Sequence, residues 1–495
     1  NMSYDAGKSW NKLNSIPLGQ FYAINVDYEK PYNVYGGLQD NGTWKGPHTY
    51  SYSKDYEAEG QYPYKSIGGG DGMQVQIDRR NSNIVYAGSQ FGYYNRMNLE
   101  TGERSFIKPS HDLGEAPYRF NWETPILLSP HNQDILYMGG NKLMRSMNQG
   151  DDWTPISPDL TAGGKKGNVP YGTLTNISES PFQFGLLYTG SDDGIIQVTK
   201  DAGGSWGIIS TGLPQNLWVS KVIASSHKKS RVYATLNGYR YDDFKPYVYV
   251  SDDYGKNWKD ISSDLPLSPV NVIIEDPVKE NILYLGTDDA SYISFDQGAS
   301  WELLDGSMPN VAVHDMVVQT EANDLVIGTH GRSIYITNLD EIQKFDTKNA
   351  SALQLFELDA VDYSTNWGRS WSAWRAANTP EIKIAVYAPQ SGKATLEILS
   401  SEEKSIKSWQ VDVEKGFNYI PYDLSISEAG KKQLERETKD LKISKAQNGV
   451  YYIAPGAYVV QVTLNGKSQT TPLKIDEGSR RRDRAEAAAN APEED

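Results

Sequence analysis

The sequence predicts an all-β protein, in which a seven-bladed Asp-box β-propeller is followed by a small immunoglobulin-like β-sandwich. Three observations lead to this prediction. A turn motif, Ser/Thr-x-Asp-x-Gly-x-x-Trp, occurs five times within the first 301 of the 495 residues. A strand-like segment that ends in Tyr-x-Gly or a close variant recurs seven times between residues 35 and 328. The composition combines 33 Tyr and 12 Trp, which favour strands, with 44 Gly and 24 Pro, which favour turns.

Each part of the turn motif, the Asp-box, has a physical role. The Ser or Thr hydroxyl and the Asp carboxylate bind backbone N–H groups of a tight hairpin. Gly adopts a backbone angle that other residues resist, and Trp folds back as an apolar plug. We therefore interpret the Asp of each box as a structural group and not as a catalytic acid or base. The copies begin at Ser3, Ser146 (with Asn148 in place of Asp), Thr199, Ser251 and Ser294, and a degenerate sixth copy spans 98–102.

The spacing of the repeated strands indicates the architecture. The repeated position holds Tyr35, Tyr86, Tyr137, Tyr188, Tyr233, Tyr284 and Val326, at intervals of 51, 51, 51, 45, 51 and 42 residues. An apolar strand precedes each repeat, and a third strand, in most units an Asp-box, and a fourth strand follow it. Four short antiparallel strands per ~50 residues are typical of propeller blades. A solenoid also repeats at such lengths, but it would not normally place a hairpin turn such as the Asp-box before the last strand of each unit.

The ends of the repeat region predict how the ring closes. The seventh unit runs from Val311 to about Leu339 and supplies three strands, but it lacks a fourth strand with its own Asp-box. The N-terminus provides a box and a strand at Ser9–Leu13, and pairing the two would close a seven-bladed ring and remove exposed edges. Alternatively, Ser3–Leu13 completes a blade of an upstream propeller, and both interpretations hold if two propellers share the crossing strands.

The sequence divides into three parts. Residues 1–345 form the predicted propeller, residues 346–476 the predicted sandwich, and residues 477–495, which contain three consecutive Arg, a flexible tail. Alternating apolar residues at 382–386, 394–398 and 458–464 predict the sandwich strands, and Asn465-Gly466 predicts a hairpin turn. The segment Ser427–Ser444, rich in Lys, Glu and Leu, is expected to be a helical insertion or a loop.

Composition excludes several classes of function. A net charge of -15 argues against nucleic acid as a partner, and no apolar run approaches the roughly 20 residues of a membrane span. The absence of Cys excludes disulfides and thiolate metal sites, and the six His show no metal-ligand spacing. No phosphate loop, dinucleotide fingerprint or calcium loop is present, so we predict no cofactor and no metal. Because the chain begins with Asn1-Met2 at the edge of an Asp-box, we expect it to be part of a longer precursor.

A polar residue stands four positions beyond each of the six repeated Tyr, and His330 stands four positions beyond Val326, the seventh member of the repeat. Equivalent positions of a propeller form a ring, so these side chains are predicted to form a polar collar at the axial channel or its mouth, where they would bind a ligand. The alternative is that they only begin the hairpin between the second and third strands. The seven residues are Gln39, Gln90, Asn141, Asp192, Asn237, Asp288 and His330.

Four carboxylates are candidates for catalysis, namely Asp40, Asp71, Asp192 and Asp288. Inverting glycoside hydrolysis needs a protonated acid and a base roughly 6.5–9.5 Å apart, a separation that a sequence cannot give. Asp71 lies in a Gly-rich loop, Gly68–Gly72, that would allow close approach of a ligand, although an Asx turn explains the same residues and is favoured. His330 could serve as a base or a ligand anchor, but a hydrogen-bonded structural role is favoured.

Several segments resemble those of bacterial sortilin-type proteins with BNR or Asp-box repeats, which are often labelled glycosyl hydrolases. The segments are 119–130, 36–42, 68–72 and 328–333 in the propeller, and 418–420 and 454–458 in the sandwich. Propellers of this plan include xyloglucanases, which hydrolyse glycans, and sortilin receptors, which bind peptides. The resemblance implies an exported protein about twice this length. The xyloglucanases carry a catalytic Asp in an Asp-x-Gly-Gly context, whereas this sequence reads Gln39-Asp40-Asn41-Gly42.

The function we expect is that of a binding protein. The propeller would hold a peptide, protein or glycan ligand at its collar, without catalysis, and would lie in the periplasm, on the outer-membrane surface or outside the cell. The alternative is an inverting endo-glycoside hydrolase of xyloglucanase-like type. A third, purely structural interpretation treats the chain as a subunit of a larger surface complex.

Overall fold

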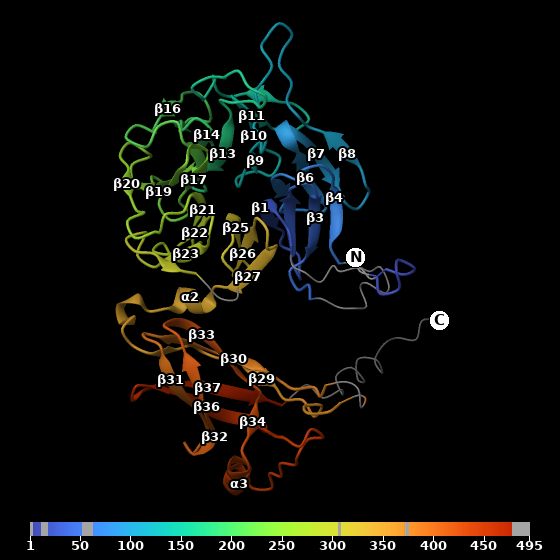
Figure 1. The fold of residues 1–495 in the computed structure, drawn as a ribbon, viewed down its shortest axis with the longest axis vertical. Helices are drawn as coiled ribbons and strands as arrows, with labels where there is room; N and C mark the ends of the chain where they lie inside the picture. Colours follow the sequence, from blue (N-terminus) through green and yellow to red (C-terminus); the bar gives the residue numbers. More distant parts are fainter. Residues whose placement is uncertain are drawn as a thin grey trace. The chain divides into compact units, whose positions relative to one another are not determined.

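The structure is a computed structural model that describes residues 3–10, 18–51, 63–304, 308–370, 372 and 376–477. Its chain divides into two compact units, Asn1–Gln343 (unit 1) and Lys344–Asp495 (unit 2). Unit 1 contains seven consecutive antiparallel sheets among the described residues, six with four strands and one with three. Within each sheet the strands are neighbours in chain order, and Figure 1 shows the sheets following one another around a common centre.

The first four sheets extend from residue 21 to residue 208. Sheet 1 comprises β1 (Phe21–Val26), β2 (Asn33–Leu38), β3 (Gly42–Pro47) and β4 (Lys65–Gly68), and sheet 2 comprises β5 (Val75–Ile77), β6 (Ile84–Ser89), β7 (Tyr93–Asn98) and β8 (Arg104–Phe106). Sheet 3 comprises β9 (Ile126–Leu128), β10 (Leu136–Gly139), β11 (Leu143–Ser146) and β12 (Thr154–Pro155), and sheet 4 comprises β13 (Leu174–Glu179), β14 (Leu187–Ser191), β15 (Ile196–Thr199) and β16 (Gly207–Ile208).

The remaining sheets of unit 1 extend to residue 338. Sheet 5 comprises β17 (Trp218–Ala224), β18 (Val232–Gly238), β19 (Asp243–Ser251) and β20 (Lys259–Asp260), and sheet 6 comprises β21 (Val270–Glu275), β22 (Leu283–Thr287), β23 (Ser291–Ser294) and β24 (Glu302–Leu303). Sheet 7 comprises β25 (Val313–Gln319), β26 (Asp324–Thr329) and β27 (Ile334–Asn338). Short helices are η1 (Gln90–Gly92), η2 (Tyr239–Tyr241) and α2 (Asp340–Lys344).

The repeated Tyr residues lie on the second strand of each sheet and are fully buried. Tyr35, for example, is 0% exposed, and its hydroxyl donates to the Asp27 carboxylate at 3.0 Å. Tyr284 makes the same contact with Asp276 at 2.8 Å. The hydroxyls of Tyr137 and Tyr233 donate to carboxylates of the next sheet, Glu179 and Glu275. Those of Tyr86 and Tyr188 have no hydrogen-bond partner among the described residues, so a carboxylate accompanies four of the six repeated Tyr.

The last three Asp-boxes each close a hairpin and also tie their sheet to the preceding one, because the Trp of each box donates to a backbone carbonyl there. In the last box, the Ser294 hydroxyl accepts from Gly298 N at 2.8 Å and donates to Asp296 Oδ1 at 2.9 Å. Gly298 has a φ of +83°, which L side chains rarely adopt. Trp301 is 8% exposed, and its Nε1 donates to the Ile261 carbonyl of sheet 5 at 2.7 Å. Trp301 is therefore an apolar plug that also makes a hydrogen bond, whereas the buried Nε1 of Trp153 in the second box has no partner among the described residues.

Replacing Trp301 by Phe should lower the free energy of unfolding by about 1–2 kcal/mol, because a buried carbonyl loses its donor. Trp10 occupies the same position in the first box but is 64% exposed, so the same change there should fall within ~0.5 kcal/mol. Thermal unfolding followed by calorimetry compares the two variants. Equal shifts for both would mean that the hydrogen bond to Ile261 contributes nothing.

Sheet 7 lies directly against sheet 1, although almost 300 residues separate them in sequence. Ile24 N donates to Asp315 Oδ2 at 3.1 Å, and the Tyr32 hydroxyl donates to Asp324 Oδ2 at 2.9 Å. Gln20 forms an isolated antiparallel bridge with His330. Of the expected fourth strand at Ser9–Leu13, Ser9 and Trp10 lie in no strand and 11–13 lie outside the described residues, so this strand stays a prediction.

Unit 2 contains two larger sheets with a common apolar core. One sheet has the order β28 (Gln354–Leu355), β30 (Ile382–Ala388), β33 (Gly416–Tyr422), and the other has the order β29 (Val361–Asp362), β37 (Lys467–Asp476), β36 (Gly456–Leu464), β31 (Gly392–Leu399), β32 (Ser405–Val413). The core includes Ile384 and Val386 from the first sheet and Leu396, Val460 and Val462 from the second. Further elements are η3 (Thr347–Asn349), β34 (Ser425–Ile426), α3 (Glu428–Glu437) and β35 (Tyr451–Tyr452).

Candidate functional site

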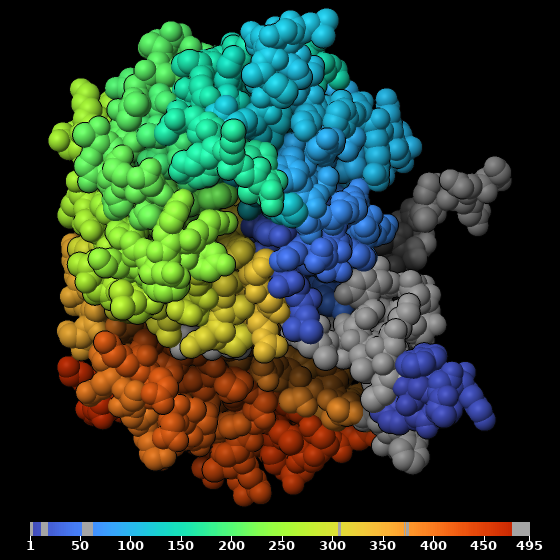
Figure 2. Space-filling model, turned by 45° about the horizontal axis from the view of Figure 1, so that its top comes forward, coloured from blue at the N-terminus to red at the C-terminus, as the bar shows by residue number. Residues whose placement is uncertain are grey.

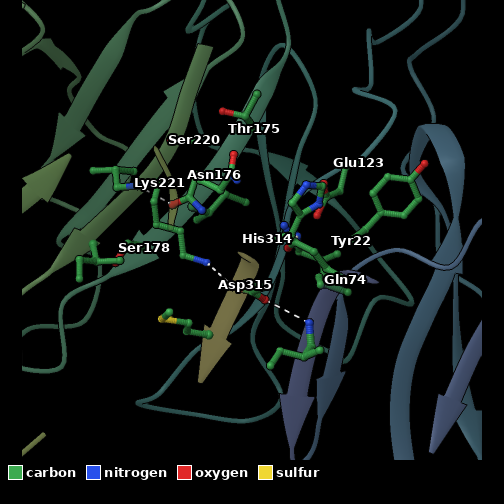
Figure 3. A pocket seen from close by; sticks show the side chains of 18 of the residues that line it. Tyr22, Gln74, Glu123, Thr175, Asn176, Ser178, Ser220, Lys221, His314 and Asp315 are labelled. Carbon is green, nitrogen blue, oxygen red and sulfur yellow. Dashed lines mark hydrogen bonds and ion pairs between the residues drawn. The ribbon is translucent and has the colours of Figure 1, made fainter. Parts of the chain in front are cut away.

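The centre of unit 1 holds a cavity of about 330 Å³, which we call the axial cavity. Residues from the first strand of every sheet line it, together with the loops around Glu123 and Arg240. Figure 2 shows the coloured segments of unit 1 around a central recess, and Figure 3 shows the side chains that face the cavity. Its labelled residues are Tyr22, Gln74, Glu123, Thr175, Asn176, Ser178, Ser220, Lys221, His314 and Asp315.

Most amides and hydroxyls of the lining serve the fold. The first strand of each sheet presents unpaired backbone groups toward its neighbour, as any edge strand does. Asn176 Oδ1 accepts from Val222 N at 3.1 Å, and the Ser220 hydroxyl donates to the Val270 carbonyl at 2.7 Å. Equivalent bonds join sheets 1 and 2, 2 and 3, and 6 and 7, through Asn25, Gln74 and Asn271. We call this set of bonds the inter-sheet belt.

One ion pair lies on the cavity wall. Lys221 Nζ in β17 is 3.0 Å from Asp315 Oδ1 in β25, so the pair joins sheets 5 and 7 (Figure 3). The other oxygen of Asp315 accepts from Ile24 N of sheet 1. The side chains are only 23% and 15% exposed, so both charges are largely removed from bulk water and depend on one another. Asp315 therefore belongs to the inter-sheet belt and also neutralises Lys221.

Glu123 precedes β9 and lines the same cavity without an ion-pair partner among the described residues. Burial, and to a smaller extent the negative charge of Asp315, raises the pKa of its carboxyl to about 8, although Lys221, Gln74 and Arg240 oppose the rise. Because this value lies above neutral pH, the carboxyl is mainly protonated at pH 7 and can donate a hydrogen bond.

Arg240 in η2 covers another part of the cavity. Its guanidinium carbon lies 4.1 Å from the centroid of the Trp218 ring, and both residues line the cavity. Within the ranges that the structure describes, Arg240 forms no ion pair. The neighbouring Tyr239 and Tyr241 are 55% and 52% exposed, so this loop presents aromatic rings and one unpaired cation to solvent.

Two imidazoles stack beside the cavity. The rings of His314 and His330 are 4.2 Å apart at an interplanar angle of 11°. Burial lowers the pKa of His314 to about 3, and the nearby His330 and Arg240 lower it too. His314 is therefore neutral at physiological pH. His330 Nδ1 lies 3.2 Å from the Phe21 carbonyl, a contact between sheets 7 and 1.

The seven predicted collar residues all fall in the described ranges. Asn237 lies inside the second strand β18, Asn141 lies two residues beyond the end of β10, and the other five come directly after the second strands of their sheets. Of the seven, Asn237 lines the axial cavity. The side chain of Asn271 links Asn237 to Asp288. Asn237 Nδ2 donates to Asn271 Oδ1, and Asn271 Nδ2 donates to Asp288 Oδ1. The printed bonds of Gln39, in contrast, involve its backbone: its N donates to the Gln20 carbonyl, and its carbonyl accepts from Asn41 Nδ2. A ligand-binding role for the collar stays a prediction.

Among the four candidate catalytic carboxylates, one hydrogen bond in the described ranges joins two of the residues, from Asp40 N to Asp71, and Asp192 and Asp288 are bound by other residues. Asp71 accepts from Asp40 N at 2.6 Å and from Gln90 Nε2 at 2.7 Å, so it staples the turns of sheets 1 and 2. Asp192 accepts from Gly172 N and from the backbone and hydroxyl of Thr173. Burial raises the pKa of Asp192, while the Thr173 hydroxyl lowers it. Burial also raises the pKa of Asp288, which Asn271 opposes.

Replacing Asp192 by Asn should cost about 1–3 kcal/mol of stability, because the amide cannot accept the bond that Thr173 Oγ1 now donates at 2.6 Å. Asp289 is exposed and its carboxylate has no hydrogen bond in the described ranges, which makes Asp289→Asn the matched control. Urea unfolding of both variants measures the difference. A wild-type midpoint for Asp192→Asn would show that the carboxylate is free to act elsewhere.

The residues that give the axial cavity its charge were missed by sequence reasoning. Glu123 lies next to Asn121-Trp122, which was noted only for the family resemblance. His314 and Asp315 interrupt the apolar run of β25, and a polar pair inside such a strand is a signal that could have been followed. Arg240 and Lys221 had no comparable signal, because single cations in loops and strands are ordinary.

Comparisons with known proteins agree with this architecture. A model of the family described as "Sortilin, neurotensin receptor 3" matches residues 246–409. The GH74 xyloglucanase from Xanthomonas campestris superposes with a TM-score of 0.50 and 16% identity, over 67% of this chain and 54% of that chain. The GH74 enzyme from Niastella koreensis superposes with a TM-score of 0.47 and 13% identity, over 92% of this chain and 73% of that chain. YCF48 bound to D1 peptide superposes with a TM-score of 0.44 and 12% identity, over 65% of this chain and 94% of that chain. No curated protein matches the chain.

These matches confirm the resemblance to sortilin-type Asp-box proteins and define the chain as a β-propeller protein. At 16% identity, the likeness to the xyloglucanase shows the fold alone, and the chain spans about half the length of that enzyme. The described residues include no helix that is long and apolar enough to span a bilayer. They also include no cluster of three or more acidic or His side chains arranged to hold a metal ion.

Proposed function

We propose that unit 1 is a closed, seven-bladed propeller and that the chain is an exported, non-catalytic binding protein. Its ligand, part of a peptide, a protein or a glycan, would enter the mouth of the axial cavity beside Trp218 and Arg240. Ring closure is supported by the contacts of sheet 7 with sheet 1. Binding is supported by the size of the cavity, because ligand sites commonly occupy about 300–1,000 Å³.

The observation that carries the non-catalytic proposal is the engagement of the candidate carboxylates. Both oxygens of Asp71 and both oxygens of Asp192 already accept hydrogen bonds from the fold. A general base must instead direct a free lone pair at the substrate or its water. The description of the matched family names a receptor, neurotensin receptor 3, and we extend a binding role to this chain as a proposal.

We propose that residues 346–476 form an immunoglobulin-like sandwich that serves as a spacer or docking module, and that residues 1–345 and 477–495 are the propeller and a tail. Two sheets with a shared apolar core support the sandwich. The periplasm, the outer-membrane surface and the extracellular medium are the proposed locations, in line with the sortilin-type resemblance.

One observation favours the second candidate, an inverting endo-glycoside hydrolase. Burial raises the pKa values of Asp192 and Asp288, which is the direction that a general acid requires. The two residues come from sheets 4 and 6, however, and no described contact joins them.

The purified chain should therefore capture members of a random-peptide or glycan array and release no sugar from a panel of plant and bacterial glycans. Tyr239→Ala, at the mouth, should weaken capture at least tenfold. Tyr4→Ala, which removes a ring of the first Asp-box that is 80% exposed against 55% for Tyr239, should not. Glycan hydrolysis that the double variant Asp192→Asn/Asp288→Asn abolishes would overturn the proposal in favour of the hydrolase.

A further inference from the structure

We propose that a second cavity, between sheets 1 and 2, binds a sugar-sized ligand through a phosphate or sulfate ester. This cavity, which we call the rim cavity, has a volume of about 510 Å³ and lies between β3 and β4 of sheet 1 and β7 and β8 of sheet 2 (Figure 1). Its lining includes Lys45, Lys65, Ile67, Asn98, Gly102 and Arg104. It shares no lining residue with the axial cavity, so the inference goes beyond the proposed function.

The rim cavity occurs where the degenerate Asp-box of sheet 2 has lost its Trp. Strand pairing leads from the repeated Tyr across the third strand to the fourth, and it ends one residue after Trp301 in sheet 6 and one residue after Arg104 in sheet 2. Arg104 therefore stands at the position of the box Trp. It also makes the equivalent bond, because its Nη2 donates to the Ile67 carbonyl of sheet 1 at 3.1 Å, as Trp301 Nε1 does to the Ile261 carbonyl of sheet 5.

The exchange of Trp for Arg leaves space between the two sheets. In sheet 6, a methyl group added to the box residue Gly298 would lie only 2.7 Å from Ile261 Cδ1 of the preceding sheet. In sheet 2, a methyl group added to Gly102 would have no neighbouring atom within 4 Å. A guanidinium on a narrow side chain keeps the hydrogen bond of the missing indole but does not replace its bulk, so a cavity remains.

The lining of the rim cavity carries three cations and no carboxylate. Lys45 on β3 and Lys65 on β4 are direct partners across the two strands, so their Cβ atoms lie roughly 4.5–5.5 Å apart and their charges repel. Within the described ranges, neither these two Lys nor Arg104 forms an ion pair. Glu100 lies next to the cavity, 3.5 Å from Asn83 Nδ2, but does not line it. An unpaired cationic cluster in a chain of net charge -15 indicates that an anion from solution compensates it.

A tetrahedral oxyanion ester fits this lining. Three cations on separate strands can approach different oxygens of one group, the two Lys as point charges and Arg104 through the N–H groups that Ile67 leaves free. Asn98 Oδ1 accepts from Glu100 N in the turn, whereas its Nδ2 donates no hydrogen bond among the described residues and can reach a sugar hydroxyl. The volume is also that of a site for a small ligand, because such sites commonly occupy about 300–1,000 Å³.

Isothermal titration calorimetry with two sugar esters tests the inference. The probes are glucose 6-phosphate and glucose 6-sulfate, and glucose is their uncharged counterpart. We expect the wild type to bind at least one ester and not to bind glucose. Glucose 6-phosphate should bind more tightly, because a phosphate monoester carries about 1.5–2 negative charges at pH 7 and a sulfate ester carries one. Binding of either ester supports the site, and the tighter one identifies the natural ligand group.

Three variants and a control assign the binding to the rim cavity. Arg104→Gln and Lys65→Gln should each weaken it roughly tenfold or more, the loss expected for one hydrogen bond to a charged group. Arg104→Trp restores the plug that sheets 4 to 6 carry and should abolish binding without lowering the unfolding temperature. Arg145 Nη1 also donates to a backbone carbonyl, that of Ala202 at 3.2 Å, but Arg145 lies outside the rim cavity. Arg145→Gln is therefore the matched control and should bind as the wild type does.

Four results would overturn the inference: neither ester binds, glucose binds as tightly as the esters, Lys65→Gln and Arg104→Gln keep the wild-type affinity, or a folded Arg104→Trp still binds. Circular dichroism establishes that each variant is folded. Lys65 is exposed and donates no hydrogen bond in the described ranges, so Lys65→Gln tests the site even if Arg104→Trp fails to fold. The proposed function is judged separately, because capture by the array depends on Tyr239, which does not line the rim cavity.

Discussion

Replacing Asp315 by Ala is expected to destabilise unit 1 by about 3–5 kcal/mol, the cost of leaving one partner of a largely buried ion pair alone. Asp315 is joined to Lys221 of sheet 5 and to Ile24 N of sheet 1, so its removal strips two bonds from the wall of the axial cavity. The Lys221 side chain, which is only 23% exposed in the wild type, would lose its counter-charge. Asp315→Asn should fall between wild type and Asp315→Ala, because an amide oxygen can still accept from Ile24.

A second ion pair of sheet 7, made with sheet 1 instead of sheet 5, provides the control. Lys30 and Glu321 are 3.3 Å apart, but their side chains are 84% and 51% exposed. Glu321→Ala should therefore change stability by less than ~1 kcal/mol, as exposed pairs generally do. Calorimetric unfolding at one pH and salt concentration compares the three variants. If Asp315→Ala unfolds at the same temperature as Glu321→Ala, the closure between sheets 7 and 1 does not depend on the ion pair of Lys221 and Asp315.

Replacing Glu123 by Gln is expected to protect the protein at alkaline pH. The pKa of Glu123 rises from 4.5 to about 8 in the folded state, mainly through burial. A raised folded pKa contributes stability that is fully present below the unfolded value and is lost as the pH rises through the folded value. The wild type should therefore lose on the order of 2–4 kcal/mol between about pH 4.5 and 8 that the Gln variant keeps.

The measurement is the difference in free energy of unfolding between Glu123→Gln and the wild type at pH 5, 6, 7, 8 and 9. This difference should grow in favour of the variant up to about pH 8 and then remain constant, because all other groups titrate alike in both proteins. Glu103, an exposed glutamate between β7 and β8, is the control, and Glu103→Gln should show a flat difference. A flat difference for Glu123→Gln as well would mean that this carboxyl ionises as it does in the unfolded chain.

The propeller could be predicted from the sequence because its signals are local and repeated. Each Asp-box contains in eight residues all the groups that its turn needs, and the bond from Ser294 to Gly298 N follows from the motif alone. The period of the buried Tyr likewise fixes where second strands fall. Neither signal tells which groups of different sheets meet, so the bond from Trp301 to the Ile261 carbonyl of another sheet could not be predicted.

The candidate site was harder to predict, because it is assembled from contacts that no spacing encodes. Counting from the repeated Tyr predicted a collar on the loops after the second strands, whereas the axial cavity is lined by first strands and two loops between other elements. Carboxylates were chosen for their residue type, yet Asp71 is occupied by Gln90 and by Asp40 N. The unusual pKa of Glu123 depends on burial within the ring, which only the folded chain creates.

The outermost strands of sheets 3 to 6 are only two residues long and exposed, whereas the inter-sheet belt holds the first strands near the axis. Foreign sequence inserted beyond β16 or β20 would consequently sit on the circumference, far from the groups that hold the wheel together. An affinity tag or a fluorophore placed there would let the molecule be anchored by its rim to a sensor chip, with its central opening left unobstructed for whatever it captures.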